Sequence, residues 1–406
     1  MQPRIDASTS RREFIQAGAA AAVIAAAPLA RGLEPAASKD KLAAGPLPTR
    51  KLGRSGVAVS VLNQGCAMRL TQRLLDHSYE CGVRYFDTAD CYGRGQSERE
   101  VAKWFERTGK RKDIFLVTKC HPTDGPKQML DMVDERLKAL KTDYIDLFFM
   151  HELCDGEYPE GAVEWPKSPE LKETAEKLKK SGKVKLVGFS CHADVRARAL
   201  ENAAAGGFVD AIMFKYDPRT TKNDAMNAAI DKCHKAGIGL IAMKTQQSSK
   251  AFKERWEKLK TDDISIQQAV VKAVLSDERL TGMTSHMENI KIIDENTAAA
   301  RSLTLASSDR DLLRTLYAAG PHHAMCERCG GECAAAVGRP NALHDVARSV
   351  MYYERYGDRD AARELYARLP ASRVDLTADE LARASTACAD GLDYAAIFAR
   401  ARRYFA

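Results

Sequence analysis

The strongest constraint on the fold is a regular alternation of short apolar runs and helix-like stretches. Eight apolar runs predict strands, at residues 59–65, 83–87, 114–119, 144–150, 184–189, 208–214, 238–243 and 279–282. Helical periodicity follows each of them or connects them, at residues 70–81, 97–107, 126–139, 169–181, 193–205, 222–236, 263–277 and 286–299. Eight such pairs over roughly 250 residues are typical of a parallel (β/α)8 barrel. We therefore predict an α/β fold, a (β/α)8 TIM barrel with a small all-helical C-terminal domain.

The two ends of the chain depart from this pattern and define the predicted domains. Residues 1–30 contain SRREFIQ followed by an alanine-rich stretch, which resembles a twin-arginine export signal and implies a periplasmic or extracytoplasmic location. The alternative is an arginine pair at the start of an ordinary amphipathic helix. Residues 31–48 are predicted as a linker, 49–305 as the barrel and 306–406 as a helical C-terminal domain with a cysteine cluster.

Charge and hydropathy exclude two classes of partner. The formal net charge of +7 is spread over helices of mixed sign, and no basic stripe is interleaved with aromatic residues, so nucleic acid is not an expected partner. The alanine-rich stretch has only about 14 residues and is weakly apolar, too short to span a bilayer comfortably. We therefore expect no stable membrane insertion.

Four residues with chemical potential stand at or just beyond the ends of predicted strands. Asp87 closes the run that begins at residue 83, and Tyr92 follows it in the loop FDTADCYG. Lys119 closes IFLVT, and His151 closes YIDLFFM. Because the carboxyl ends of barrel strands converge on one face, these side chains are expected to meet there. A tyrosine, a lysine, a carboxylate and a histidine together can deliver a proton to a substrate oxygen.

FDTADCYG, VTKC and LFFMHE resemble, in that order and at similar spacings, the catalytic motifs of the aldo-keto reductases. The resemblance implies that Tyr92 is the general acid that protonates a carbonyl oxygen. Lys119 would lower the pKa of the phenol from its usual value of about 10, and Asp87 would hold the lysine in place. His151 would orient the carbonyl oxygen.

The resemblance also implies a nicotinamide cofactor, NAD(P)(H), but the positions that would bind it depart from the family pattern. They are Ser190, Cys191, Met213, Met243, Lys244 and Gly282. The residues near the expected 2′-phosphate position, Met283 and Asn289, carry no charge. A phosphate without a cation is poorly bound, so we predict no strong preference for NADPH over NADH.

A cluster of cysteines marks the C-terminal domain. Three of the eleven cysteines fall within CERCGGEC, namely Cys326, Cys329 and Cys333, a spacing that suits a soft metal centre. Similar runs occur in the ferredoxin-like tails of one branch of the family. Cys388 precedes a helix that resembles the second such run, so we predict a [4Fe-4S] cluster held by these four thiols. A zinc site with His322 or His323, a degenerate site and a disulfide remain alternatives.

The sequence thus predicts an exported oxidoreductase that reduces a small-molecule carbonyl, or oxidises the corresponding alcohol. An iron–sulfur cluster would add an electron-transfer partner. The rival hypothesis is a catalytically inactive barrel that serves as a binding or scaffold protein.

Overall fold

The structure of the protein, a computed structural model, describes residues 46–67, 69–216, 218, 220, 223–246, 264–318, 331–356, 359–388 and 391–405. The predicted export signal, residues 1–30, lies outside them, as does nearly all of the predicted linker. Leu42–Ala406 form one compact unit. No helix of the described residues is long and apolar enough to cross a membrane.

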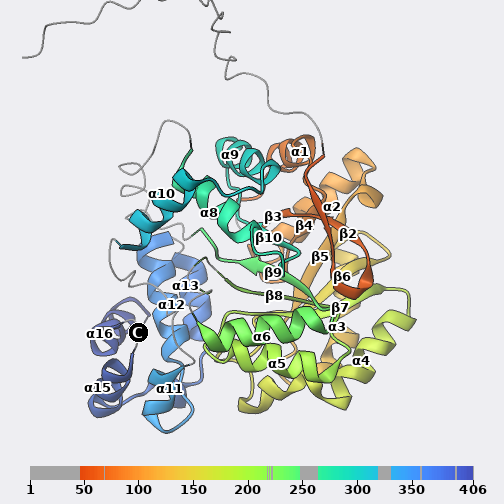
Figure 1. Ribbon diagram of the computed structural model, residues 1–406. Helices are drawn as coiled ribbons and strands as arrows, with labels where there is room; N and C mark the ends of the chain where they lie inside the picture. Colours follow the sequence, from red (N-terminus) through yellow and green to blue (C-terminus); the bar gives the residue numbers. More distant parts are fainter. Residues whose placement is uncertain are drawn as a thin grey trace, which may run out of the picture. The chain divides into compact units, whose positions relative to one another are not determined.

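The predicted barrel is confirmed. Its closed parallel sheet has the order β10-β3-β4-β5-β6-β7-β8-β9, in which neighbouring strands follow the chain until the last pairs with the first (Figure 1). The strands are β3 (Leu62–Gly65), β4 (Tyr85–Asp87), β5 (Phe115–Cys120), β6 (Ile145–Met150), β7 (Val184–Cys191), β8 (Ala211–Lys215), β9 (Gly239–Met243) and β10 (Gly282–Ser285). Most of their residues are buried, because helices cover the outer face of a parallel barrel.

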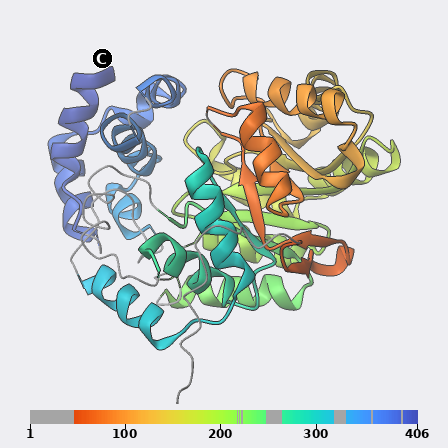
Figure 2. The same ribbon diagram turned by 90° about the horizontal axis from the view of Figure 1, so that it is seen from above.

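Eight described helices belong to this β/α pattern and surround the strands (Figures 1 and 2). They are α1 (Gln72–Glu80), α2 (Gln96–Thr108), α3 (Met129–Leu140), α4 (Pro169–Lys180), α5 (Arg196–Gly206), α6 (Asp224–Lys235), α8 (Ile266–Leu275) and α9 (Ile290–Arg301). Local sequence explains several starts. Ser168 caps α4 with a proline at its first position, and Ser265 forms a capping box with Gln268 at α8. Each cap satisfies backbone N–H groups that the helix itself leaves unpaired.

A hairpin precedes the barrel, as TRKLGRSGVAVS suggests. Strand β1 (Thr49–Lys51) pairs antiparallel with β2 (Ala58–Ser60). Arg50 donates to the carbonyls of Leu275 and Leu280, which precede β10, at 2.6 and 2.7 Å. The hairpin therefore lies at the amino-terminal end of the strands and leaves the opposite end for chemistry.

The described residues beyond the barrel are helical, as predicted. The helices are α10 (Ser307–Ala318), α11 (Glu332–Val337), α12 (Leu343–Met351), the π-helix η7 (Tyr352–Tyr356), α13 (Arg359–Ala367), α14 (Ala371–Val374), α15 (Ala378–Ala387) and α16 (Tyr394–Phe405). Leu313 of α10 packs into the barrel core, whereas α11, α12, α15 and α16 bury a second core of their own. The boundary between barrel and tail near residue 305 stays a prediction.

Candidate active site

The four predicted residues come together at the carboxyl ends of β4, β5 and β6. Lys119 Nζ lies 2.7 Å from Asp87 Oδ1 and donates to the Thr88 carbonyl at 2.8 Å. It also donates to the Tyr92 hydroxyl at 3.3 Å. Lys119 is 1% exposed and Asp87 2%. A buried ion pair of this kind holds the ammonium group against the phenol and leaves it little freedom to move.

His151 completes the group. Its ring meets the edge of Tyr92, with 5.4 Å between centroids and 79° between planes. Its backbone is held on both sides, because its N–H donates to Cys120 at 2.7 Å and its carbonyl accepts from the Tyr158 hydroxyl at 2.6 Å. Glu152 follows with a φ of +52°, an uncommon left-handed turn that is supported by a bond from its N–H to Ser190 Oγ at 2.9 Å.

The surroundings of the site shift the pKa values of Tyr92 and His151, and the shift of Tyr92 is opposite to the one expected from the sequence. Burial raises the pKa of Tyr92 well above 10, and the negative charge of Asp87 adds to this effect. The net shift of the Tyr92 pKa is therefore upward, opposite to the lowering expected from Lys119, because burial and the negative charge of Asp87 dominate. Burial lowers the pKa of His151 well below its usual range, and the nearby His121 acts in the same direction. Near pH 7 the site thus holds a protonated phenol beside a neutral imidazole.

Four of the six predicted cofactor positions lie at the end of the barrel where Tyr92 lies, and Met213 and Gly282 do not. Ser190 and Cys191 end β7, and Met243 and Lys244 end and follow β9, at the same end of the barrel as Tyr92. Lys244 has a φ of +56° and donates to the hydroxyl of Tyr352 in η7. Met213 is 1% exposed and packs in the barrel interior.

Gly282 and Met283 lie elsewhere. Gly282 opens β10 at its amino-terminal end, where an added Cβ would meet the Val61 carbonyl at 2.6 Å. Its lack of a side chain is required by packing between strands, and the structure does not bring it to the site. Met283 is fully buried, and Asn289 caps α9 by accepting from the Ile292 N–H at 3.0 Å. Met283 therefore cannot reach a phosphate, and Asn289 is exposed but uncharged.

Sequence reasoning missed a buried arginine from the C-terminal helices. Arg348 of α12 is 0% exposed. Its guanidinium lies 2.7 Å from Asp155 Oδ2, 3.1 Å from Asp345 Oδ1 and 3.4 Å from Glu152 Oε1. Mainly through burial, the pKa of Asp155 and that of Asp345 are both raised to about 7. Glu152 was visible within LFFMHE, whereas nothing in the local sequence around Arg348 signalled this contact.

The predicted metal ligands are described only in part. Cys326 and Cys329 lie outside the described residues. Cys333 in α11 and Cys388 at the end of α15 are both buried in the second core. Cys333 Sγ lies 3.3 Å from the Tyr394 hydroxyl, and Cys388 Sγ accepts the Leu392 N–H at 3.3 Å. Burial, with a contribution from Cys388, raises the pKa of the Cys333 thiol.

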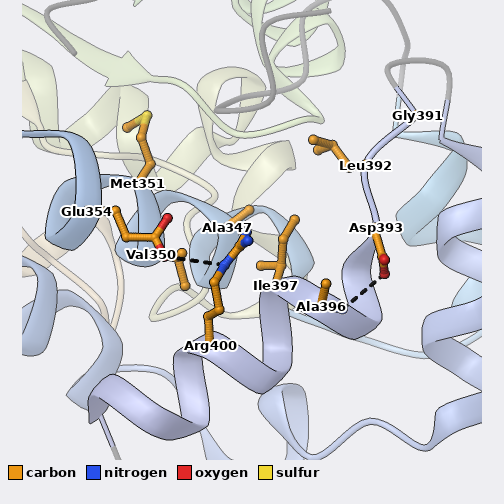
Figure 3. A pocket seen from close by; sticks show the side chains of 10 residues that line it. All are labelled: Ala347, Val350, Met351, Glu354, Gly391, Leu392, Asp393, Ala396, Ile397 and Arg400. Atoms are coloured by element: carbon orange, nitrogen blue, oxygen red, sulfur yellow. Dashed lines mark hydrogen bonds and ion pairs between the residues drawn. The ribbon is translucent and has the colours of Figure 1, made fainter. Parts of the chain in front are cut away.

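The C-terminal helices also contain a cavity of about 360 Å³, lined by residues of α12, η7 and α16 (Figure 3). Apolar side chains such as Met351 and Ile397 line it, with an ion pair of 3.3 Å between Glu354 and Arg400. Its lining holds no thiol, imidazole or phenol. The acid–base groups described above are therefore concentrated at the barrel end and not in this cavity.

Comparison with known proteins agrees with the geometry at the strand ends. The family model described as "Aldo/keto reductase family" matches residues 60–318, well over half of the chain. The chain belongs to the aldo/keto reductase family. The match ends with α10, before the cysteine cluster and the second core.

Individual relatives of this aldo/keto reductase are moderately distant. An aldo-keto reductase of Schizosaccharomyces pombe named with NADP(+) is 28% identical over 217 residues, 48% of this chain and 60% of its own. The aldo-keto reductase str7 of Strobilurus tenacellus is 32% identical over 219 residues, again 48% and 60%. The chain thus spans less than two thirds of the length of these relatives.

Solved structures show the same fold. The aldo-keto reductase of Klebsiella pneumoniae in complex with NADPH has a TM-score of 0.53 at 21% identity, covering 67% of this chain and 95% of its own. The holo form of AKR11C1 from Bacillus halodurans has a TM-score of 0.52 at 22% identity, covering 66% and 96%. At such identities the likeness establishes the barrel alone.

Proposed function

We propose that the protein is an oxidoreductase that reduces a small-molecule carbonyl with a nicotinamide cofactor, or catalyses the reverse oxidation of an alcohol. One observation carries this proposal. The Tyr92 hydroxyl contacts Lys119 Nζ at 3.3 Å, and Lys119 is paired with Asp87 at 2.7 Å, at the end of the barrel where His151 also lies. This is the arrangement that proton transfer to a carbonyl oxygen requires.

Each of the four side chains has a defined part in that transfer. Tyr92 keeps its proton in the resting protein because its pKa is raised by burial and by Asp87. As negative charge grows on the substrate oxygen, the phenol gives up its proton, and Lys119 stabilises the phenolate that remains. His151 is neutral and can donate one N–H to the same oxygen. The nicotinamide, when bound, supplies the hydride that reaches the carbonyl carbon.

The described residues fit the core of such a cofactor better than its 2′-phosphate. The Ser190 hydroxyl accepts from Glu152 and so still has its own proton to donate to a carboxamide oxygen, from a position 1% exposed. Lys244 brings a positive charge to the same end of the barrel. Met283 and Asn289 offer no cation, and Lys291 is 72% exposed beside Glu295. We therefore propose NAD(P)(H) use without a strong preference for NADPH.

The finer predictions extend this proposal to the C-terminal helices. We propose a [4Fe-4S] cluster held by Cys326, Cys329, Cys333 and Cys388, which would exchange electrons with a partner. The shared burial of Cys333 and Cys388 supports it. Zinc, a degenerate site and a disulfide are the alternatives for these thiols. The motif SRREFIQ supports export by the twin-arginine route.

Replacing the phenol tests the proposal most directly. Tyr92→Phe should lower carbonyl turnover by roughly 10²- to 10⁴-fold while nicotinamide affinity, followed by fluorescence quenching, stays the same. Tyr79→Phe is the matched control, because the Tyr79 hydroxyl bonds Asp113 on the outside of the barrel at 2.8 Å. A similar rate for Tyr92→Phe and the unmodified protein would remove Tyr92 from the reaction. If the unmodified protein neither quenches with NADH or NADPH nor turns over any carbonyl, the scaffold hypothesis is favoured.

A further inference from the structure

A cluster of side chains shares His151 with the four residues discussed so far and adds three groups that the proposed reaction does not use. Asp90 and Cys91 precede Tyr92 in the loop after β4, and His121 directly follows β5. With His151 they present two imidazoles, a thiol and a carboxylate, whose ligand atoms all lie within 4.8 Å of one another. Three adjacent strands therefore deliver a mixed set of nitrogen, sulfur and oxygen ligands to one point.

Two of the six separations among these ligand atoms match those around a tetrahedral zinc ion. Zinc bonds are about 2.0–2.2 Å long to nitrogen and oxygen and about 2.3 Å to sulfur, so neighbouring ligand atoms of a tetrahedron stand about 3.3–3.6 Å apart. His121 Nδ1 lies 3.3 Å from Asp90 Oδ1. Cys91 Sγ lies 3.5 Å from His151 Nδ1. The two imidazole rings are 4.5 Å apart between centroids. All four ligand atoms lie within 4.8 Å of one another, so shifts on the order of 1 Å would close this set around a metal ion.

The surroundings have the features that support metal ligands. The other nitrogen of His121, Nε2, faces Glu152 at 3.6 Å and Glu157 at 3.5 Å and is buried without a hydrogen bond. Metal-binding histidines commonly direct their second nitrogen to a carboxylate in this way. Asp90 Oδ1 accepts the Cys91 N–H at 2.6 Å, which fixes the carboxylate. The thiolate and the Asp90 carboxylate would together neutralise a divalent cation.

We propose that Asp90, Cys91, His121 and His151 bind a divalent cation of the zinc type. Two imidazoles, a thiolate and a carboxylate in tetrahedral arrangement select zinc over magnesium or calcium, which prefer oxygen ligands alone. Metal binding does not depend on the proposed reaction, but the two sites share His151, so the metal would affect the geometry of the reaction. With Nδ1 of His151 on the metal, Nε2 is left for a substrate oxygen. The bond to Cys91 would also fix the loop that carries Tyr92.

The competing description is a salt-bridge cluster around a protonated histidine. Burial works against protonation of His121, but its contacts with Asp90 and Glu152 raise its pKa to about 10. A protonated imidazole cannot bind a metal, so the two descriptions exclude each other. Metal content and spectroscopy of the full-length protein separate them.

The test compares the unmodified protein with Cys91→Ser and His121→Asn after loading with Zn²⁺, and with Co²⁺ as a spectroscopic probe. Each variant should bind one equivalent less zinc, and Cys91→Ser should lose the cobalt–thiolate absorbance of this site. Cys233→Ser is the matched thiol control, because Cys233 is buried in α6 and donates to the Leu200 carbonyl at 3.1 Å, away from the proposed ligands. Any metal held by the C-terminal cysteines is the same in the unmodified protein and the three variants, so it does not change the difference in metal content between them.

A variant that keeps all four ligands shows whether a loss of metal has a cause other than misfolding. Glu157→Gln keeps the four ligands and should weaken zinc binding by roughly 10- to 100-fold, the effect typical of a lost partner of a ligating histidine. Tyr92→Phe should retain the full zinc content, which separates failure of this site from failure of the proposed reaction. If Cys91→Ser and His121→Asn bind as much zinc as the unmodified protein, the metal site is overturned and the cluster is a set of salt bridges around protonated His121.

Discussion

The barrel and the C-terminal helices are stabilised in different ways. The barrel is a closed ring of eight strands whose buried apolar residues form large continuous cores, and it contains every residue of the proposed catalytic group. The helices from α11 to α16 are 4 to 12 residues long, share one much smaller core and keep two cysteines within it. A closed barrel can bury enough apolar surface to fold by itself, whereas a small helical unit commonly needs a metal or a partner surface.

The contacts between the two regions show which partner surface the helices use. Arg348 reaches the carboxylates of Glu152 and Asp155, two residues that follow β6. Gly156 in the same loop donates its N–H to Asp345 at 2.8 Å, and Arg373 donates to the carbonyls of Gly156 and Tyr158 at 3.1 and 3.2 Å. The loop that positions His151 is thus also the docking surface of the C-terminal helices. The match to the family model ends at residue 318, before these helices, yet Arg348 of α12 contacts the loop that follows His151.

The largest effect should follow from removing one proposed cluster thiol. Cys388→Ser should lose most of the bound iron and the broad visible absorbance of anaerobically purified protein, because metal binding is part of the folding free energy of a small domain. Limited proteolysis should then cut the C-terminal helices while the barrel survives. Cys233→Ser, a buried thiol of the barrel, should change neither property. Unaltered iron and protease resistance in Cys388→Ser would make Cys388 a packed thiol only.

Arg348→Met should detach the C-terminal helices from the loop after β6. Removing one member of a buried ion pair typically destabilises by about 3–5 kcal/mol, because the remaining carboxylates lose their partner. Arg363→Met is the control, since Arg363 is 52% exposed and its pair with Asp360 spans 3.7 Å. Hydrogen exchange of α12, compared between the two variants, provides the measurement. Equal protection of α12 in both would show that apolar packing alone holds these helices.

Glu98 of α2 is a buried carboxylate within the barrel, and its ionisation provides a test of barrel stability. Its side chain is 1% exposed, and burial raises its pKa from 4.5 to about 7. The folded state therefore holds this proton more tightly than the unfolded state. Its contribution to stability is complete below about pH 4.5, falls as the pH rises to about 7, and is constant above.

The pH range of that loss gives the measurement. Glu98→Gln should remove a decline of about 3 kcal/mol in the unfolding free energy between these two pH values. Urea unfolding at several pH values in both proteins would show it. Glu106→Gln, at a residue about half exposed, is the control on the same helix. Parallel curves for Glu98→Gln and the unmodified protein would mean that Glu98 ionises normally.

The smallest expected effect concerns the cofactor phosphate. NADPH should bind no more than about tenfold more tightly than NADH, equivalent to about 1.4 kcal/mol. The reason is that Met283 is buried and that Asn289, which caps α9, carries no positive charge for a phosphate. Fluorescence titration with both cofactors gives the ratio, and Lys291→Met tests the exposed lysine at the start of α9. A thousandfold preference that Lys291→Met abolishes would show that this lysine has taken over the phosphate.

The sequence by itself determined the barrel and the meeting of Asp87, Tyr92, Lys119 and His151. Alternating apolar and amphipathic segments leave few other folds, and parallel topology brings residues that follow successive strands to one end. No detailed knowledge of packing is needed for that conclusion. The strand predicted at 279–282 instead spans Gly282–Ser285, because a run of apolar residues does not show at which residue a strand begins.

Only the tertiary structure decided the rest. The direction of the Tyr92 pKa depends on how deeply the phenol is buried and how completely Asp87 neutralises Lys119, which spacing along the chain does not specify. The contact of Arg348 with Glu152 joins residues 196 positions apart. The cluster of Asp90, Cys91, His121 and His151 likewise depends on the ångström-scale separation of side chains from three strands. Local patterns report periodicity and strand order, whereas burial and charge pairing arise from segments distant in the chain.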